Sequence, residues 1–188
     1  MQEDLQLQIQ QLQQQVEKLQ KKVDKMQNSR KDQLSIACVS GDLDKILATM
    51  IISIAAAAMD TKVKIFFSFW ALSALRDKHK HAKGKDIISK MFGIMLPKGK
   101  DQLKLSNMNM AGMGPMMIKY LMKKQNVLSL DQMFKTAGEL GVEIIVCEMS
   151  MGLMGFKKEE MIDYPHLSFA GAATFVADAG ESAAQLFV

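Results

Sequence analysis

The stretch LSIACVSGDLDKILATM, residues 34–50, decides the fold class of this chain. Residues 34–40 are a short run of strand-favouring residues that ends at Gly41 and Asp42. Asp42 is a residue type that caps helices, and the apolar spacing that follows predicts a helix over residues 43–59. A strand that leads directly into a helix is the first part of a βαβ unit, from which parallel sheets are built.

Strand and helix patterns continue to alternate along the chain. Residues 62–70 (KVKIFFSFW) and 142–149 (VEIIVCEM) are nearly continuous apolar runs, as expected of strands covered on both faces. Helices are predicted at about 116–124, at 129–140 between Ser129 and Gly141, at 157–162 and at 169–179, and a last strand at 184–188. The sequence therefore predicts an α/β fold over residues 33–188: a doubly wound, mainly parallel sheet of about five strands flanked by helices.

Residues 1–28 form a separate segment with an unbroken heptad pattern. Apolar residues occupy the a positions Ile9, Val16 and Val23 and the d positions Leu5, Leu12, Leu19 and Met26. β-branched a residues with leucine at d favour a parallel two-stranded coiled coil, and three strands remain open. We predict an N-terminal coiled-coil helix that joins copies of the chain into a homo-oligomer. The alternative is a disordered glutamine-rich tail.

The composition is that of a soluble globular domain with an appendage. The 188 residues are 48% hydrophobic and 23% charged, with a formal net charge of +4. The longest apolar run, residues 46–59, is shorter than the ~20 residues of a transmembrane helix, and the first residues lack the apolar core of a signal peptide. Two cysteines are too few for a disulfide framework. We therefore expect a cytoplasmic protein with no membrane span.

Charge and motif content exclude several function classes. The mild net charge does not require nucleic acid, and no nucleic-acid partner is expected. No G-x-G-x-x-G, G-x-x-x-x-G-K-[ST] or G-x-S-x-G motif is present, so no cofactor is expected. His79 and His81 lack a third ligand, and no metal site is expected. An acidic or anionic partner is compatible with the basic stretch Arg76, Lys78, Lys80, Lys83, Lys85 and Lys90.

The carboxyl ends of parallel strands meet at one edge of a sheet, where ligands bind. Residues 40–42, 68–70 and 147–150 are therefore expected to converge there. Cys147 is the predicted catalytic residue, because helix N–H groups next to a strand end lower the pKa of a thiol and favour the nucleophilic thiolate. Such a thiolate is suited to attack on, or storage of, sulfane sulfur. The predicted substrate-binding residues are Ser40, Gly41, Trp70, Met149, Ser150 and Met151.

Two thiols and a methionine-rich segment have alternative interpretations. Cys147 is either this reactive thiol or an inert residue packed in a strand. Cys38 lies inside the first predicted strand, between Ala37 and Val39, and is predicted to be structural. The methionine-rich residues 91–122 are compatible with a soft-metal binder, since thioethers suit Cu(I), but an adaptable lid or a subunit interface is favoured, since methionine fills irregular apolar surfaces.

Six segments in chain order resemble the DsrE/DsrF-like family, in the subgroup loosely labelled peroxiredoxin-like. They are VSGDLDK (39–45), AAAAMD (55–60), IFFSFWALSAL (65–75), GMGPMM (112–117), CEMSMGLMG (147–155) and GAATF (171–175). The resemblance implies an α/β oligomer in which Cys147 carries persulfide sulfur between TusA-like carriers and rhodanese-like donors. Gly152 departs from the acidic residue expected there, and the Pro-x-x-x-Thr-x-x-Cys pattern of peroxiredoxins is missing around Cys147.

Three functional hypotheses follow from these observations. The first is a sulfur carrier or sulfurtransferase that accepts and passes on sulfane sulfur, as persulfide or thiosulfonate, on Cys147. The second is a non-catalytic oligomeric interaction scaffold in which Cys147 is structural. The third is a thiol redox switch, which requires a disulfide between Cys38 and Cys147.

Overall fold

A computed structural model describes residues 2–28, 31–82 and 87–188, and in it the sheet has five parallel strands. The strands are β1 (Lys31–Cys38), β2 (Lys62–Phe67), β3 (Glu143–Cys147), β4 (Leu167–Ala170) and β5 (Ser182–Phe187). Their order in the sheet is β4-β3-β2-β1-β5, and every adjacent pair is parallel. The predicted α/β architecture with a mainly parallel sheet is confirmed.

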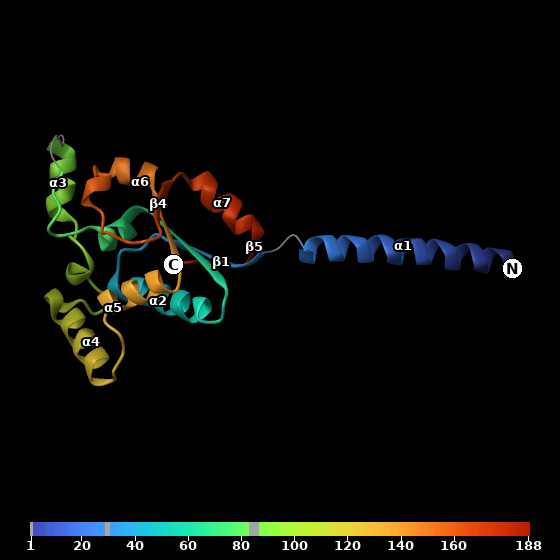
Figure 1. Cartoon of the computed structure of the whole chain (residues 1–188), viewed down its shortest axis with the longest axis horizontal. Coiled ribbons are helices and arrows are strands. Elements are labelled where there is room, and N and C mark those ends of the chain that lie inside the picture. Colours follow the sequence, from blue (N-terminus) through green and yellow to red (C-terminus); the bar gives the residue numbers. More distant parts are fainter. Residues whose placement is uncertain (1, 29–30, 83–86) are drawn as a thin grey trace.

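Helices cover the two faces of the sheet unequally (Figure 1). α2 (Leu43–Ala57) and α5 (Leu130–Glu139) pack against each other on one face. α7 (Ala172–Glu181) lies on the other face and contacts β1. The chain steps in one direction from β1 to β4 and then returns to the opposite edge for β5. Because such crossovers are right-handed, the return places α7 on the face opposite to α2 and α5.

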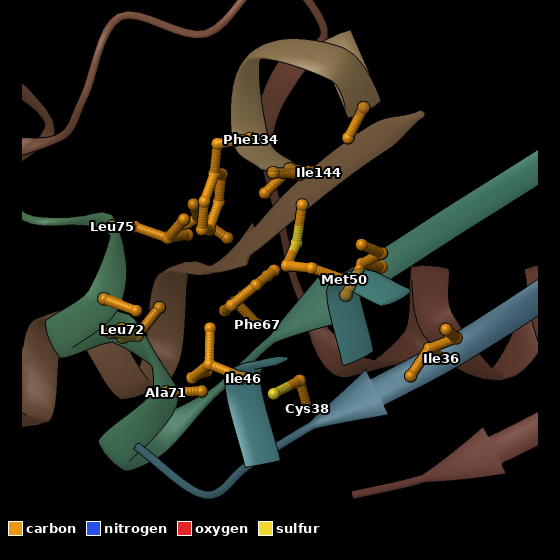
Figure 2. Packing of buried hydrophobic residues seen from close by; sticks show 14 of the residues in the cluster. Ile36, Cys38, Ile46, Met50, Phe67, Ala71, Leu72, Leu75, Phe134 and Ile144 are labelled. Atoms are coloured by element: carbon orange, nitrogen blue, oxygen red, sulfur yellow. The ribbon is translucent and has the colours of Figure 1, made fainter. Parts of the chain in front are cut away.

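The main core lies between the sheet and α2 and α5. Cys38, Ile46, Met50 and Phe67 are among its completely buried members, and their side chains gather in one cluster (Figure 2). A smaller cluster on the α7 face contains Phe66, Ile145 and Cys147. Successive residues of a strand point to opposite faces, so Phe66 and Phe67 belong to different clusters.

The long connection from β2 to β3 contains several short helices. These are η1 (Phe69–Leu75), α3 (Ile87–Met95), η2 (Lys100–Gln102), η3 (Met110–Gly112) and α4 (Met113–Lys124). The guanidinium of the buried Arg76 donates hydrogen bonds to the carbonyl oxygens of Gly93, Leu96 and Pro97, and this holds the end of α3 against the domain. Beyond β3 come α6 (Glu148–Leu153) and η4 (Lys158–Glu160).

Most predicted elements have somewhat different boundaries in the structure, and two of the differences lie at the carboxyl edge of the sheet. The strand expected over residues 62–70 ends at Phe67, because the chain leaves the extended conformation at Phe69, whose φ is 45°, and enters η1 there. The helix expected over residues 169–179 begins only at Ala172, since β4 occupies Leu167–Ala170. β4 has four residues, too few for a clear alternating pattern. α6 was likewise not predicted.

α1 (Gln2–Asn28) is a single helix that projects from the α/β domain (Figure 1). Its heptad residues Ile9, Leu12, Val16, Leu19 and Val23 are 48–60% exposed, so the domain does not cover this apolar row. The side chains of Leu5 and Met26, like Lys83 and Lys85 of the basic stretch, lie outside the described part of the structure. Within the described ranges, no helix combines the length and the hydropathy needed to cross a bilayer.

Gly41 tests the packing between the β1–α2 turn and η1. A Cβ atom at this position would lie 2.3 Å from the Trp70 carbonyl oxygen, so Gly41→Ala must displace backbone. We expect the free energy of unfolding to fall by about 1–3 kcal/mol in urea denaturation. Gly180→Ala is the matched control, because a Cβ there meets nothing within 4 Å and helical alanine is favoured. Equal stability of the two variants would contradict the packing argument.

Candidate functional site

Cys147 is the last residue of β3 and the N-cap residue of α6. The β2–β3 register pairs Phe67, the last residue of β2, with Val146, so Cys147 lies at the carboxyl edge of the sheet, beside Ser68. β4 pairs Ala170 with Cys147 on the other side. The thiol therefore lies where three adjacent strands end, at the edge that parallel α/β sheets use for ligands.

Two serine hydroxyls connect β2 to the thiol. The Ser150 hydroxyl donates to Cys147 Sγ at 3.3 Å, and the Ser68 and Ser150 hydroxyl oxygens are 2.8 Å apart. Burial alone would raise the pKa of Cys147. Hydrogen bonds from the hydroxyl and N–H of Ser150, the Ser68 hydroxyl and the Met149 N–H outweigh it, so the pKa of Cys147 lies below the ordinary value of a thiol.

The thiol is covered in this structure, with only 1% of Cys147 exposed. Phe175 of α7 and Ala170 of β4 pack against the cluster formed by Phe66, Ile145 and Cys147. The ring centroids of Phe66 and Phe175 are 5.4 Å apart. The sequence predicted Trp70 as a binding residue and the methionine-rich segment as a lid or subunit interface, whereas in the structure Phe175 of α7 provides the cover of the thiol.

The predicted substrate-binding residues divide into two groups. Ser150 contacts Cys147 directly, and Met149 is exposed at the start of α6. Met151 packs into the main core and does not join the cluster of Cys147. Ser40, Gly41 and Trp70 instead line a separate hollow of about 250 Å³, together with Met95 and Lys104.

Phe175 is the site residue that sequence reasoning did not single out, whereas Ser68 was expected at this edge as part of residues 68–70 but not as a hydrogen-bond partner in the site. Ser68 directly follows β2, and its position after a buried strand was the signal available. Phe175 is brought to the thiol only by the packing of α7 on the sheet, which no local pattern indicates. Asp42 occupies the N-cap of α2 as predicted, but its carboxylate accepts from the Ser40 hydroxyl at 2.8 Å instead of capping.

A profile of the DsrE/DsrF/DrsH-like family matches residues 30–187. The chain belongs to this family. It is 46% identical over 154 residues to YrkE, an uncharacterized protein of Bacillus subtilis, covering 82% of this chain and 95% of YrkE. It is 32% identical over 160 residues to the sulfur carrier protein DsrE2 of Allochromatium vinosum, covering 83% and 98% of the two chains.

Among solved structures, the YchN protein of E. coli aligns with a TM-score of 0.47 at 9% identity, over 83% of this chain and 99% of YchN. The family match begins at residue 30, so α1 lies outside it.

The two cysteines of this DsrE/DsrF-like chain lie on opposite faces of the sheet. Cys38 belongs to the main core and pairs in register with Phe67, whereas Cys147 belongs to the cluster under α7. Burial raises the pKa of Cys38 to about 11, although the Thr49 hydroxyl partly opposes this. β2 separates their strands, which places the two residues roughly 10 Å apart, beyond the ~7 Å limit between disulfide-bonded Cα atoms. The arrangement of the strands therefore argues against the Cys38–Cys147 disulfide that the redox-switch hypothesis requires.

Basic side chains near the site are engaged in local pairs. Lys158 Nζ lies 2.7 Å from Glu148 Oε1 and sits over the Phe169 ring at 4.6 Å. Glu148 is the first residue of α6, next to Cys147, so Lys158 offsets the nearest negative charge. The thiolate is thus stabilised chiefly by hydroxyl and N–H donors.

Ser150→Ala should slow the reaction of Cys147 with iodoacetamide at pH 7 roughly tenfold, because the lost donor destabilises the thiolate and raises the pKa of Cys147. Peptide-resolved mass spectrometry measures the rate at Cys147 alone, and the difference should vanish at a pH above both pKa values. Ser168→Ala, in an exposed position of β4, is the control and should react at the unaltered rate. Equal rates in the two variants across this pH range would show that Ser150 does not tune the thiol.

Proposed function

We propose that this DsrE/DsrF-like protein is a cytoplasmic sulfur carrier that accepts sulfane sulfur on Cys147 and passes it to another thiol. The observation that supports this most is a thiol of lowered pKa held at the end of β3 by the Ser150 and Ser68 hydroxyls. The family and a relative named as a sulfur carrier agree with it. A reducing cytoplasm keeps such a thiol free of structural disulfides.

The proposed transfer is a thiol exchange without net oxidation. The Cys147 thiolate attacks the outer sulfur of a donor persulfide, a new S–S bond forms on Cys147, and the donor S–S bond breaks. The bonding electron pair leaves with the donor as its thiolate, which takes up a proton from solvent. In the second exchange, the thiolate of an acceptor attacks the outer sulfur carried on Cys147, and Cys147 leaves as a thiolate. The lowered pKa of Cys147 therefore favours both its role as nucleophile and its role as leaving group.

The surroundings of Cys147 can stabilise a sulfur atom carried on the thiol and limit its exposure to solvent. The Ser150 and Ser68 hydroxyls and the adjoining N–H groups are donors that stabilise negative charge on a thiolate or on a persulfide. α7 begins directly after β4, whose Ala170 pairs with Cys147, so the positive ends of α6 and α7 both lie beside this residue. The cover by Phe175 limits contact with water and with unrelated thiols.

Transfer requires α7 to move, and α7 is weakly anchored. Of its ten residues, all in the described part of the chain, Ala179 alone is buried. Its other ties are largely polar, including the ion pair of Lys64 with Asp178 at 2.5 Å and a hydrogen bond from Gln33 to the Asp178 carbonyl. A helix held by few apolar contacts opens at low free-energy cost.

Partner thiols are proposed to dock beside α6. Phe69, Met149 and Leu153 are exposed apolar residues that follow Ser68 and Cys147 in the chain. A TusA-like carrier or a rhodanese-like donor would place its own cysteine there. Adaptable methionine and aromatic side chains are typical of surfaces that bind several partners.

We further propose that α1 joins copies of the chain through a coiled coil, separate from the α/β domain over residues 33–188. The uncovered row from Ile9 to Val23 supports this, since an isolated helix of this kind is marginal in water. Neutral glutamines beside the row neither repel nor select a partner of different sequence. Clustered domains would present several thiols to one partner.

Incubation with a low-molecular-weight persulfide tests the carrier function. We expect intact-mass spectrometry to show the added mass of one sulfur atom, removable by a reducing agent. Cys147→Ser should lose this gain and Cys38→Ala should keep it, because Cys38 is sealed in the main core with a raised pKa. A gain that persists in Cys147→Ser, or no gain in the unaltered chain, would leave only the scaffold role.

Leu12→Glu in the full-length chain should lower the molar mass of the oligomer measured by light scattering, because it places a charge in the apolar row of α1. Gln14→Glu introduces the same charge outside the row and should leave the mass unchanged. Identical masses for Leu12→Glu and the unaltered chain would show that α1 does not determine assembly.

A further inference from the structure

A second cavity lies on the face of the sheet opposite to Cys147. α2, α4 and α5 enclose it, and its volume is about 380 Å³. Figure 1 shows α4 and α5 on the other side of the sheet from α6 and α7. The volume is within the range of small-molecule sites, which are usually apolar clefts with a few polar groups.

The walls of this cavity are apolar. Leu47 of α2, Met122 of α4 and Leu130 of α5 line it, and Val127 of the α4–α5 connection lies at its open side, 43% exposed. α4 packs loosely over the domain: it buries only Gly114 and Pro115 among its residues, all of which are described. α4 therefore covers the cavity without filling it with its own side chains.

Positive charge exceeds negative charge at the mouth of the cavity, where three lysines and two aspartates line the opening. Asp131 pairs with Lys100 at 2.5 Å, and Asp101 pairs at 3.0 Å with Lys78, which lies outside the cavity. The Lys119 ammonium donates to the Asp101 carbonyl oxygen at 2.9 Å, and its charge helps to lower the pKa of the Asp101 carboxyl. Within the described part of the chain, the Lys123 ammonium makes no hydrogen bond or ion pair; the Lys123 carbonyl oxygen accepts from the Asn126 N–H. Lys119 and Lys123 are one helical turn apart, so both ammonium groups line one side of the opening.

We propose that this cavity binds a linear amphipathic anion with an alkyl chain and a carboxylate head. The chain would lie against Leu47, Met122 and Leu130, and the carboxylate would pair with Lys119 and Lys123. An apolar wall selects the chain and the excess of lysines over aspartates selects an anion, so a neutral alcohol or an amine of equal length binds less well. The site is independent of Cys147 and of sulfur transfer.

Calorimetric titration of the full chain with decanoate, below its micelle concentration, tests the proposal. We expect one saturable site per chain, with weaker binding of decanol and of decylammonium. Val127→Trp should weaken decanoate binding at least tenfold, since the ring occupies the cavity, whereas Leu128→Trp, an exposed neighbour outside the lining, should not. Lys123→Ala should weaken binding about two- to fivefold, as for an exposed ion pair, and Lys124→Ala should leave it unchanged.

Several results would overturn this assignment. Decanoate that fails to saturate shows that the cavity takes no such ligand. Binding that survives Val127→Trp in a folded chain places the ligand elsewhere, for example along the apolar row of α1. If decanol binds as tightly as decanoate, or if Lys123→Ala binds decanoate with full affinity, the lysines do not recognise the carboxylate and the proposal is contradicted. Because Lys123 is exposed, its substitution keeps the test valid even where Val127→Trp does not fold.

Discussion

The backbone register of the three central strands determines the face of the sheet on which each cysteine side chain lies. Cys38 pairs with Phe67 and Phe67 pairs with Val146, so these three residues share one row and one face. Cys147 is the next residue along β3, and the alternation of a strand turns its side chain to the other face. A shift of β3 by one residue would move Cys147 to the face of the main core and Val146 to the face under α7. The distinction between a structural and a reactive thiol thus depends on pairing as well as on local sequence.

The two faces provide very different surroundings. The face under α2 and α5 is a large hydrocarbon core, where burial raises the pKa of Cys38. The face under α7 is narrower and partly polar, with Gln33, Ser35 and Lys64 beneath the helix. There, hydroxyl and N–H donors outweigh burial at Cys147. Because α7 is held over this face by few apolar contacts, it can move away from the sheet at low free-energy cost. This motion would expose Cys147, as the proposed exchange of sulfur requires.

The long β2–β3 connection lets one sheet carry distinct surfaces. Arg76 fixes the end of α3 through three carbonyl oxygens, and the loosely packed α4 leaves the lysine-lined cavity open. The cavity lies on the other side of the sheet from α6 and α7, where Cys147 is found, whereas α3 lies beside the residues that follow α6, since Arg76 sits over the Phe156 ring at 4.4 Å. α1 projects from the domain and leaves its apolar row free. The thiol, the cavity and the helical arm are therefore separable by single substitutions.

The sequence by itself determined the alternation of strands and helices, the heptad row of α1 and the position of Cys147 at a strand end, because each depends on local periodicity and capping. It missed β4 and α6, which are too short to show a period. Only the tertiary structure decided that Ser68 and Ser150 reach the thiol, that α7 covers it, and that Ser40 and Trp70 line a different hollow. These outcomes depend on the order and register of strands distant in the chain and on the face to which a crossover carries its helix, which no local pattern encodes.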